Sequence, residues 1–168
     1  MQDEPFAYFL TWTCYGTHLP GANSGWTKWH KGDRLPEPQL EDWCRDRMTE
    51  SAVTLTSLQR RIVEQVIRDH CKRRSWTLHA ANCRSNHCHV VVTATGYAGD
   101  QVRNQFKSWT TRGLKEDELL QRSPPKRLRE RWWTRQGSVR HLFDEQSLEA
   151  AVIYTLDSQD QGGSKARI

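Results

Sequence analysis

The amino-acid sequence predicts an α+β fold, a ferredoxin-like α/β sandwich built on a mostly antiparallel sheet. Amphipathic segments long enough for helices alternate with short segments rich in aromatic and β-branched residues. Two of these short segments are separated by only three residues, which favours a hairpin. Two helices packed on one face of an antiparallel sheet suit this order of elements. The 168 residues suffice for a single domain, 1–168, with its own core.

The first expected strand spans residues 6–16, because FAYFLTWTCYG is rich in aromatic and β-branched residues and ends at a glycine. Residues 17–50 then lack periodicity and contain three prolines and three glycines, so we expect a long loop insertion there. Its tryptophans Trp26, Trp29 and Trp43 indicate that the insertion is partly packed against the domain.

The remaining elements are predicted from hydrophobic periodicity and from the residues that bound each segment. Apolar residues recur at four-residue steps after Thr56 and Ser57, either of which is a plausible helix cap. In chain order we expect a helix at 57–74, strands at 76–83 and 87–94, a helix at 99–120, a strand at 138–143 and a last helix at about 147–157.

The net charge of +5 is concentrated late in the chain. Residues 121–141 carry seven basic side chains against one acidic side chain, with Trp132 and Trp133 among them. Cations interleaved with aromatic rings suit single-stranded nucleic acid, although a solvated basic face with two core tryptophans is an equal alternative. The candidate nucleic-acid-binding residues are Arg122, Lys126, Arg127, Arg129, Arg131, Trp132, Arg135 and Arg140.

Other features of the sequence bear on where the protein works. No apolar run is long enough to span a bilayer, and the start, MQDEPFAYFL, lacks the form of a signal peptide. We therefore expect a cytoplasmic protein with no membrane partner. The five cysteines include no C-x-x-C pair, which favours reduced thiols over a disulfide framework.

The segment CRSNHCHVVVTA, residues 83–94, contains two histidines in its most strand-like part. On a strand, His87 and His89 point to one face while Cys88 points to the other. Two such imidazoles can form the edge of a metal site but do not complete one. They could instead form hydrogen bonds within a polar sheet face, or join Cys83 and Cys88 in a structural zinc site, although Cys88 then points away.

Tyr154 lies off the apolar stripe that we expect on the last helix. Leu148, Val152 and Leu156 form that stripe, and at 100° per residue Tyr154 falls nearly opposite it. Its neighbours on the same side of the helix are small, which leaves room for a reactant to approach the phenol. Packing of Tyr154 over an adjacent loop is the alternative.

These segments together resemble a known family. SNHCHVVV resembles the histidine–hydrophobic–histidine (HUH) motif of the single-tyrosine transposases, and especially of the REP-associated tyrosine transposases. FLTWTCYGTHLPG resembles the opening strand and turn of that family, FKSWTTRGL the helix after its motif, RWWTRQGSVRHLF its tryptophan-and-glycine segment, and AAVIYTLDSQ its tyrosine helix. The matches occur in order from about residue 8 to residue 163, so they cover nearly the whole chain.

The resemblance implies a metal-dependent endonuclease and strand transferase acting on single-stranded DNA that carries a hairpin. His87, His89 and a polar residue of the tyrosine helix would hold Mg²⁺ or Mn²⁺ against the scissile phosphate. Tyr154 would attack this phosphate, leaving a covalent 5′-phosphotyrosine and a free 3′-hydroxyl. The basic segment 122–140 and the tryptophan-rich insertion 17–50 are the candidates for gripping the DNA. A monomer and a homodimer are both compatible with one nucleophilic tyrosine per chain.

The sequence departs from the family pattern at two positions. Cys88 occupies the centre of the motif, where a bulkier aliphatic residue is usual. Four residues after the tyrosine, where the family carries Gln or Asn, this chain has Ser158. We expect Gln159 to be the third metal ligand, with Asp157 as the second choice. The alternative function is a catalytically inactive nucleic-acid-binding module on the same fold.

Overall fold

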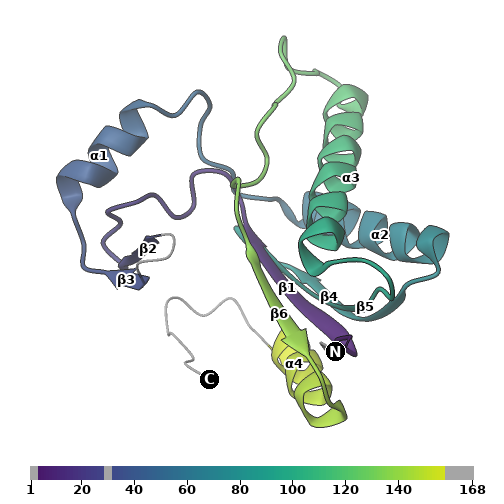
Figure 1. The fold of residues 1–168 in the computed structure, drawn as a ribbon. Coiled ribbons are helices and arrows are strands. Elements are labelled where there is room, and N and C mark those ends of the chain that lie inside the picture. The colour runs from purple at the N-terminus through teal and green to yellow at the C-terminus, as the bar shows by residue number, and fades with distance from the viewer. Residues whose placement is uncertain (1–3, 29–31, 158–168) are drawn as a thin grey trace.

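The computed structural model describes residues 4–28 and 32–157. Its main sheet has four strands in the order β4-β5-β1-β6, and every neighbouring pair is antiparallel. This order, with α2 (Ser57–Arg74) between β1 and β4 and α3 (Gly99–Leu120) between β5 and β6, is that of a ferredoxin-like sandwich (Figure 1). The predicted fold class is therefore confirmed. The strands are β1 (Ala7–Thr13), β4 (Thr77–Cys83), β5 (His87–Thr93) and β6 (Ser138–Leu142).

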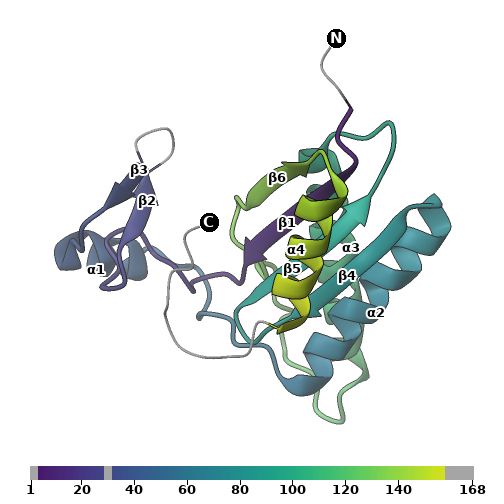
Figure 2. The same ribbon diagram turned by 90° about the horizontal axis from the view of Figure 1, so that it is seen from below.

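Helices cover both faces of this sheet. Helices α2 (Ser57–Arg74) and α3 (Gly99–Leu120) pack on one face and enclose the main core, which includes Leu10, Val90 and Phe106. Helix α4 (Glu145–Asp157) lies on the opposite face, where a smaller core forms around Val91 (Figures 1 and 2). The sheet is thus the middle of three layers. Two helices cover one of its faces, and a single helix lies on the other.

Local sequence signals account for the bounds of α2. The Thr56 hydroxyl accepts a hydrogen bond from the Gln59 backbone N–H, and the Gln59 side chain accepts one from the Thr56 N–H. This capping box satisfies two of the donors that a helix leaves unpaired at its start. At the other end Ser75 adopts a left-handed conformation with φ of 56°, which ends the helix.

The insertion predicted at 17–50 contains short regular elements. They are strands β2 (Trp26–Lys28) and β3 (Gly32–Arg34), which pair with each other, and helix α1 (Pro38–Asp46). Leu40, Trp43 and Cys44 recur at three- and four-residue steps along helix α1, but no residue of this helix is buried. Gly21, with φ of 89°, lies so close to α1 that an added Cβ would come within 2.3 Å of the Glu37 carbonyl oxygen.

None of the helices among residues 4–28 and 32–157 combines the length and the apolar character needed to cross a membrane.

Candidate active site

The two histidines of β5 lie on the same face of the sheet, as predicted. Antiparallel pairing places His89 opposite Thr11 and His87 opposite Thr13 on β1. The intervening Cys88 points into the main core on the other face and is fully buried. The centroids of the two imidazole rings are 4.7 Å apart, with the rings nearly perpendicular. This face is the one that carries α4, so the histidines and the C-terminal helix share one side of the sheet.

His89 is only 6% exposed and is held by two residues of β1. Its Nδ1 lies 3.0 Å from the Thr11 Oγ1, and the Phe9 ring stacks on it at a centroid distance of 5.6 Å. Burial lowers the pKa of His89 to about 4, and the neighbouring His87 and Arg84 contribute in the same direction. The imidazole is therefore neutral at physiological pH, which is the form that a metal ion binds.

His87 is oriented by the residue that precedes it. Its Nδ1 lies 2.6 Å from the side-chain oxygen of Asn86, an acceptor, so Nδ1 carries the proton. In this tautomer Nε2 has the lone pair that a metal ligand requires. A hydrogen bond of this kind also fixes the direction of the ring.

Tyr154 projects from α4 toward the buried histidine. The centroid of its ring lies 5.5 Å from that of His89 and 5.9 Å from that of Phe9, in edge-to-face arrangements. The side chain remains 41% exposed. The tyrosine thus packs on the sheet beside the histidine pair, and the alternative of packing over a loop does not describe its ring contacts.

The apolar stripe expected on the last helix is partly wrong. Leu148 and Val152 pack against the smaller core, but Leu156 is 59% exposed. The deeply buried positions are instead Ala151 and Thr155, whose small side chains allow the helix to lie close to the sheet. Tyr154 lies three residues after Ala151 and is therefore its neighbour on the surface of the helix. Its side chain reaches the sheet for this reason.

Asn82 links the histidine strand to the tyrosine helix, and sequence reasoning missed it. It lies on β4 directly opposite His89. Its side-chain amide donates a hydrogen bond of 2.8 Å to the backbone carbonyl of Thr155, one residue after Tyr154. The sequence places Asn82 on the strand predicted at 76–83, but no motif distinguishes it from an asparagine on the surface.

The third metal ligand is the least complete part of the site. Gln159 and Ser158 lie outside the described residues. Asp157, the last described residue of α4, is exposed. Within residues 4–28 and 32–157, no three His, Cys, Asp or Glu side chains form a group that could hold an ion. The described donors are two imidazoles, which suit Mn²⁺ better than Mg²⁺ because Mg²⁺ prefers oxygen ligands.

The alternative of a zinc site that combines Cys83 and Cys88 with the histidines is wrong. The two sulfur atoms lie 3.1 Å apart, but both side chains are buried in the main core. The histidines occupy the opposite face of the sheet, so one ion cannot reach all four side chains. Burial also raises the pKa of the Cys88 thiol well above its ordinary value, which disfavours the thiolate that zinc requires.

The basic residues of 121–141 do not form one uniform surface. Trp132 is only 3% exposed and belongs to the main core, so its indole cannot stack on a base and its predicted binding role is withdrawn. Arg129 is mostly enclosed and donates hydrogen bonds to the backbone carbonyl and hydroxyl of Ser51. Arg127 forms an ion pair with Glu130. The exposed members of the predicted set are Arg122, Lys126, Arg127, Arg131, Arg135 and Arg140.

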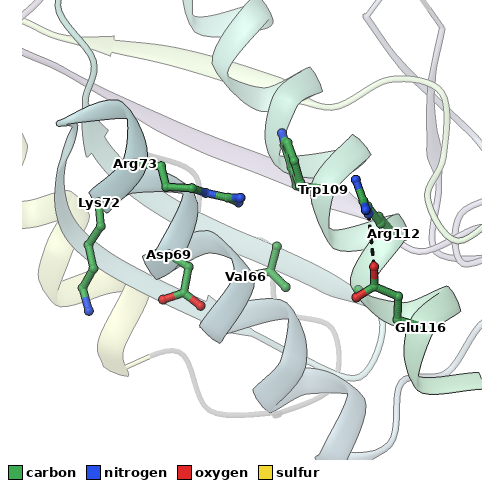
Figure 3. Close-up of a pocket in the computed structure, with 8 residues that line it drawn as sticks. Val66, Asp69, Lys72, Arg73, Trp109, Arg112 and Glu116 are labelled. Atoms are coloured by element: carbon green, nitrogen blue, oxygen red, sulfur yellow. Dashed lines mark hydrogen bonds and ion pairs between the residues drawn. The ribbon is translucent and has the colours of Figure 1, made fainter. Parts of the chain in front are cut away.

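A separate groove of about 620 Å³ lies between α2 and α3 (Figure 3). Trp109 borders it, with the Arg73 guanidinium 4.4 Å and the Arg112 guanidinium 5.5 Å from its ring centroid. Asp69 and Glu116 offset these cations, and Glu116 pairs directly with Arg112. The groove belongs to the helical layer on the other side of the sheet from the histidines, so it is not part of the candidate active site.

No protein-family model matches the sequence, and a search of curated proteins gives no match. The structure is similar to the crystal structure of a putative transposase from Deinococcus radiodurans R1. The two chains are 11% identical, and the TM-score of the superposition is 0.44. The match covers 88% of this chain and 86% of that chain.

Proposed function

We propose that this protein is a transposase that cleaves single-stranded DNA with Tyr154 as the nucleophile. The observation that carries the proposal is the distance of 5.5 Å between the ring centroids of Tyr154 and His89, on the sheet face that also carries His87. A tyrosine that only filled the core would be buried, whereas this one is 41% exposed. The resemblance of the sequence to the single-tyrosine transposases supports the same assignment.

The proposed reaction exchanges one phosphoester bond for another. The Tyr154 oxygen attacks the scissile phosphorus and forms a phosphotyrosine bond to the 5′ side of the DNA. The bond from phosphorus to the 3′ oxygen breaks. This oxygen takes up the proton that the phenol loses and leaves as a hydroxyl. Because the phosphoester bond is kept in the covalent intermediate, the 3′-hydroxyl can later attack it and rejoin a strand without ATP.

His87 and His89 are the residues that would hold the divalent ion in this reaction. When bound, such an ion neutralises charge that develops on the non-bridging phosphate oxygens and orients the phosphate for in-line attack. The pairs Asn86–His87 and Thr11–His89 fix the two rings before any ligand arrives. Gln159 is proposed as the third ligand and Asp157 as its substitute.

The proposed substrate is a single strand next to a folded hairpin. The exposed cations of 122–140 would bind its phosphates, and the insertion 17–50 would contact the hairpin. One nucleophilic tyrosine per chain supports one cleavage, so complete strand exchange requires a homodimer or two successive rounds by a monomer.

The test is to incubate the protein with labelled hairpin-bearing single-stranded DNA and Mn²⁺ and to look for an adduct that survives denaturing electrophoresis. We expect wild-type protein to form the adduct, and Tyr154→Phe, His87→Ala and added EDTA each to abolish it. Tyr154→Phe is the sharpest variant because it removes only the hydroxyl and keeps the ring contacts. An adduct that persists in this variant would exclude Tyr154 as the nucleophile.

One observation favours the alternative of a nucleic-acid-binding module without catalysis. Among the described residues only two side chains are placed to bind the ion, and a third ligand is needed for a stable site. In the same experiment this alternative predicts that labelled DNA is retarded in a native gel while no covalent adduct forms under any metal condition.

A further inference from the structure

The sheet face that carries the histidines is only partly covered by α4. The helix packs mainly across β4 and β5 and contacts β6 only slightly (Figure 2). Side chains on the uncovered side are polar, and we call them the polar shelf. The polar shelf consists of Thr11 and Thr13 of β1, His87 of β5, and Ser138 and Arg140 of β6.

The strand register fixes the position of Arg140 on this shelf. Arg140 pairs with Phe9 of β1, so the two side chains project from the same face. Phe9 in turn contacts the rings of both His89 and Tyr154. Leu142, two residues further along β6, lies in the smaller core under α4, which confirms the direction of alternate side chains on this strand.

Arg140 has fewer contacts than Arg127, Arg129 and Arg131, and unlike Arg122 and Arg135, which are also exposed and unpaired among the described residues, it lies on the sheet. It is exposed, and within the described parts of the chain it forms no hydrogen bond or ion pair. By contrast, Arg127 is paired with Glu130, Arg129 is bonded to Ser51, and Arg131 lies over the ring of Tyr15. A guanidinium with neither partner nor local carboxylate is suited to an anion brought by a ligand.

The distance from Arg140 to the histidine pair suits contact with a phosphate next to the scissile one rather than with the scissile phosphate itself. Arg140 lies two strand spacings, about 10 Å, across the sheet from β5 and two residues, about 7 Å, along it from His89, so the two Cα atoms are about 12 Å apart. An extended arginine side chain is shorter than this separation. Its guanidinium therefore stops short of an ion held by His87 and His89. Phosphate oxygens one nucleotide away from the scissile bond fall within its reach.

We propose that Arg140, assisted by the Ser138 hydroxyl, binds the phosphate adjacent to the scissile one, so that the DNA strand crosses the polar shelf over β6. This proposal rests on the proposed function and adds the path of the strand. Guanidinium and hydroxyl groups are the usual phosphate contacts in protein–DNA interfaces. None of the five shelf residues carries a carboxylate that would repel the strand.

The experiment compares Arg140→Ala with Arg61→Ala, which removes an exposed cation of α2 on the other side of the sheet. Binding of a single strand and the rate of adduct formation are measured over a range of salt concentrations. We expect Arg140→Ala to weaken binding about tenfold and to lower the salt slope by about one. Adduct formation at saturating DNA should change little, and Arg61→Ala should leave all three quantities near their wild-type values.

Substrate modification then locates the contact. Each phosphate that flanks the scissile one is replaced in turn by an uncharged methylphosphonate. For one of the two positions we expect a loss of about tenfold with wild-type protein and almost none with Arg140→Ala. Equal losses in both proteins at both positions would overturn the proposal. If wild-type protein forms no adduct, the proposed function fails, yet the binding comparison still decides whether Arg140 contacts a phosphate.

Discussion

At the scale of single residues, His89 is the side chain most strongly shaped by its surroundings. Three rings and a hydroxyl enclose it: Phe9, His87 and Tyr154, with Thr11 on Nδ1. An imidazole enclosed in this way is kept neutral because the charged form would lose its hydration. This enclosure therefore makes folding sensitive to pH.

The prediction concerns the pH dependence of stability in metal-free buffer. The pKa of His89 falls from an ordinary value of 6.5 to about 4 in the folded protein, chiefly through burial. Between these values the unfolded chain binds a proton that the folded protein does not, so the free energy of unfolding decreases as the pH falls. We expect His89→Gln to reduce this slope by up to about 1.4 kcal/mol per pH unit.

Chemical denaturation at several pH values from 6.5 to 4 measures this slope. Tyr154→Phe is the control, since it changes the neighbour of His89 and leaves the histidine itself in place. Identical slopes for wild-type protein and His89→Gln would contradict the assigned environment of the histidine.

At the scale of elements, the position of α4 decides whether Tyr154 meets the histidines. Small residues at Ala151 and Thr155 allow close packing, and the hydrogen bond from Asn82 holds the end of the helix. A shift of about 1 Å in a nucleophile can cost a hundredfold in rate. Asn82 of β4, opposite His89, therefore helps to fix the position of Tyr154 through the backbone of α4.

We expect Asn82→Ala to slow adduct formation about tenfold or more while reducing stability by only about 1 kcal/mol. Thr56→Ala is the matched control, because loss of the α2 cap costs a similar amount of stability at a distance from α4. The rate of adduct formation and the denaturation midpoint are measured for both variants. If both slow the reaction equally, the effect of Asn82 is general destabilisation and not positioning of α4.

The elements that the sequence predicted correctly are those with a strong local signal. The four-residue repeat and cap of α2, and the hairpin of β4 and β5, appear within one or two residues of their expected bounds. Helix α1 was missed because its apolar residues, Leu40, Trp43 and Cys44, form a stripe of little more than one turn in a segment rich in proline and glycine. Leu156 was misplaced because hydropathy cannot reveal that a helix packs through alanine and threonine. Asn82 and Arg140 acquire their positions only through strand pairing, which the chain order alone does not give.

At the scale of the whole molecule, the insertion and the basic segment are joined beside the main sheet. Glu50, at the end of the insertion, accepts hydrogen bonds from the backbone N–H groups of Glu130 and Arg131. Arg129 in turn donates hydrogen bonds to Ser51. We call these contacts of Glu50 and Ser51 with residues 129–131 the clamp. Burial raises the pKa of the Glu50 carboxyl, but these two N–H groups and the Arg129 charge outweigh it and lower the pKa overall. The two regions proposed to grip DNA are therefore connected through one ionised carboxylate.

We expect Glu50→Gln to release residues 129–131 from the insertion, because a neutral amide accepts these hydrogen bonds less strongly than a carboxylate does. The loss of stability should be about 2 kcal/mol, and the backbone amides of Glu130 and Arg131 should exchange faster with solvent. DNA affinity should fall because the basic segment must then be ordered during binding. Glu116→Gln, which removes an exposed ion pair with Arg112, is the control and should change stability by less than about 0.5 kcal/mol.

Hydrogen exchange and DNA binding are measured on the same two variants. Together they distinguish an effect on the clamp from an effect on DNA affinity. Faster exchange at Glu130 and Arg131 together with weaker binding would mean that the clamp holds the basic segment in its binding position. Faster exchange with unchanged affinity would contradict the role of this segment in gripping DNA, while leaving the clamp itself intact. Unchanged exchange would contradict the clamp, because an amide that keeps its protection has not lost its hydrogen-bond acceptor.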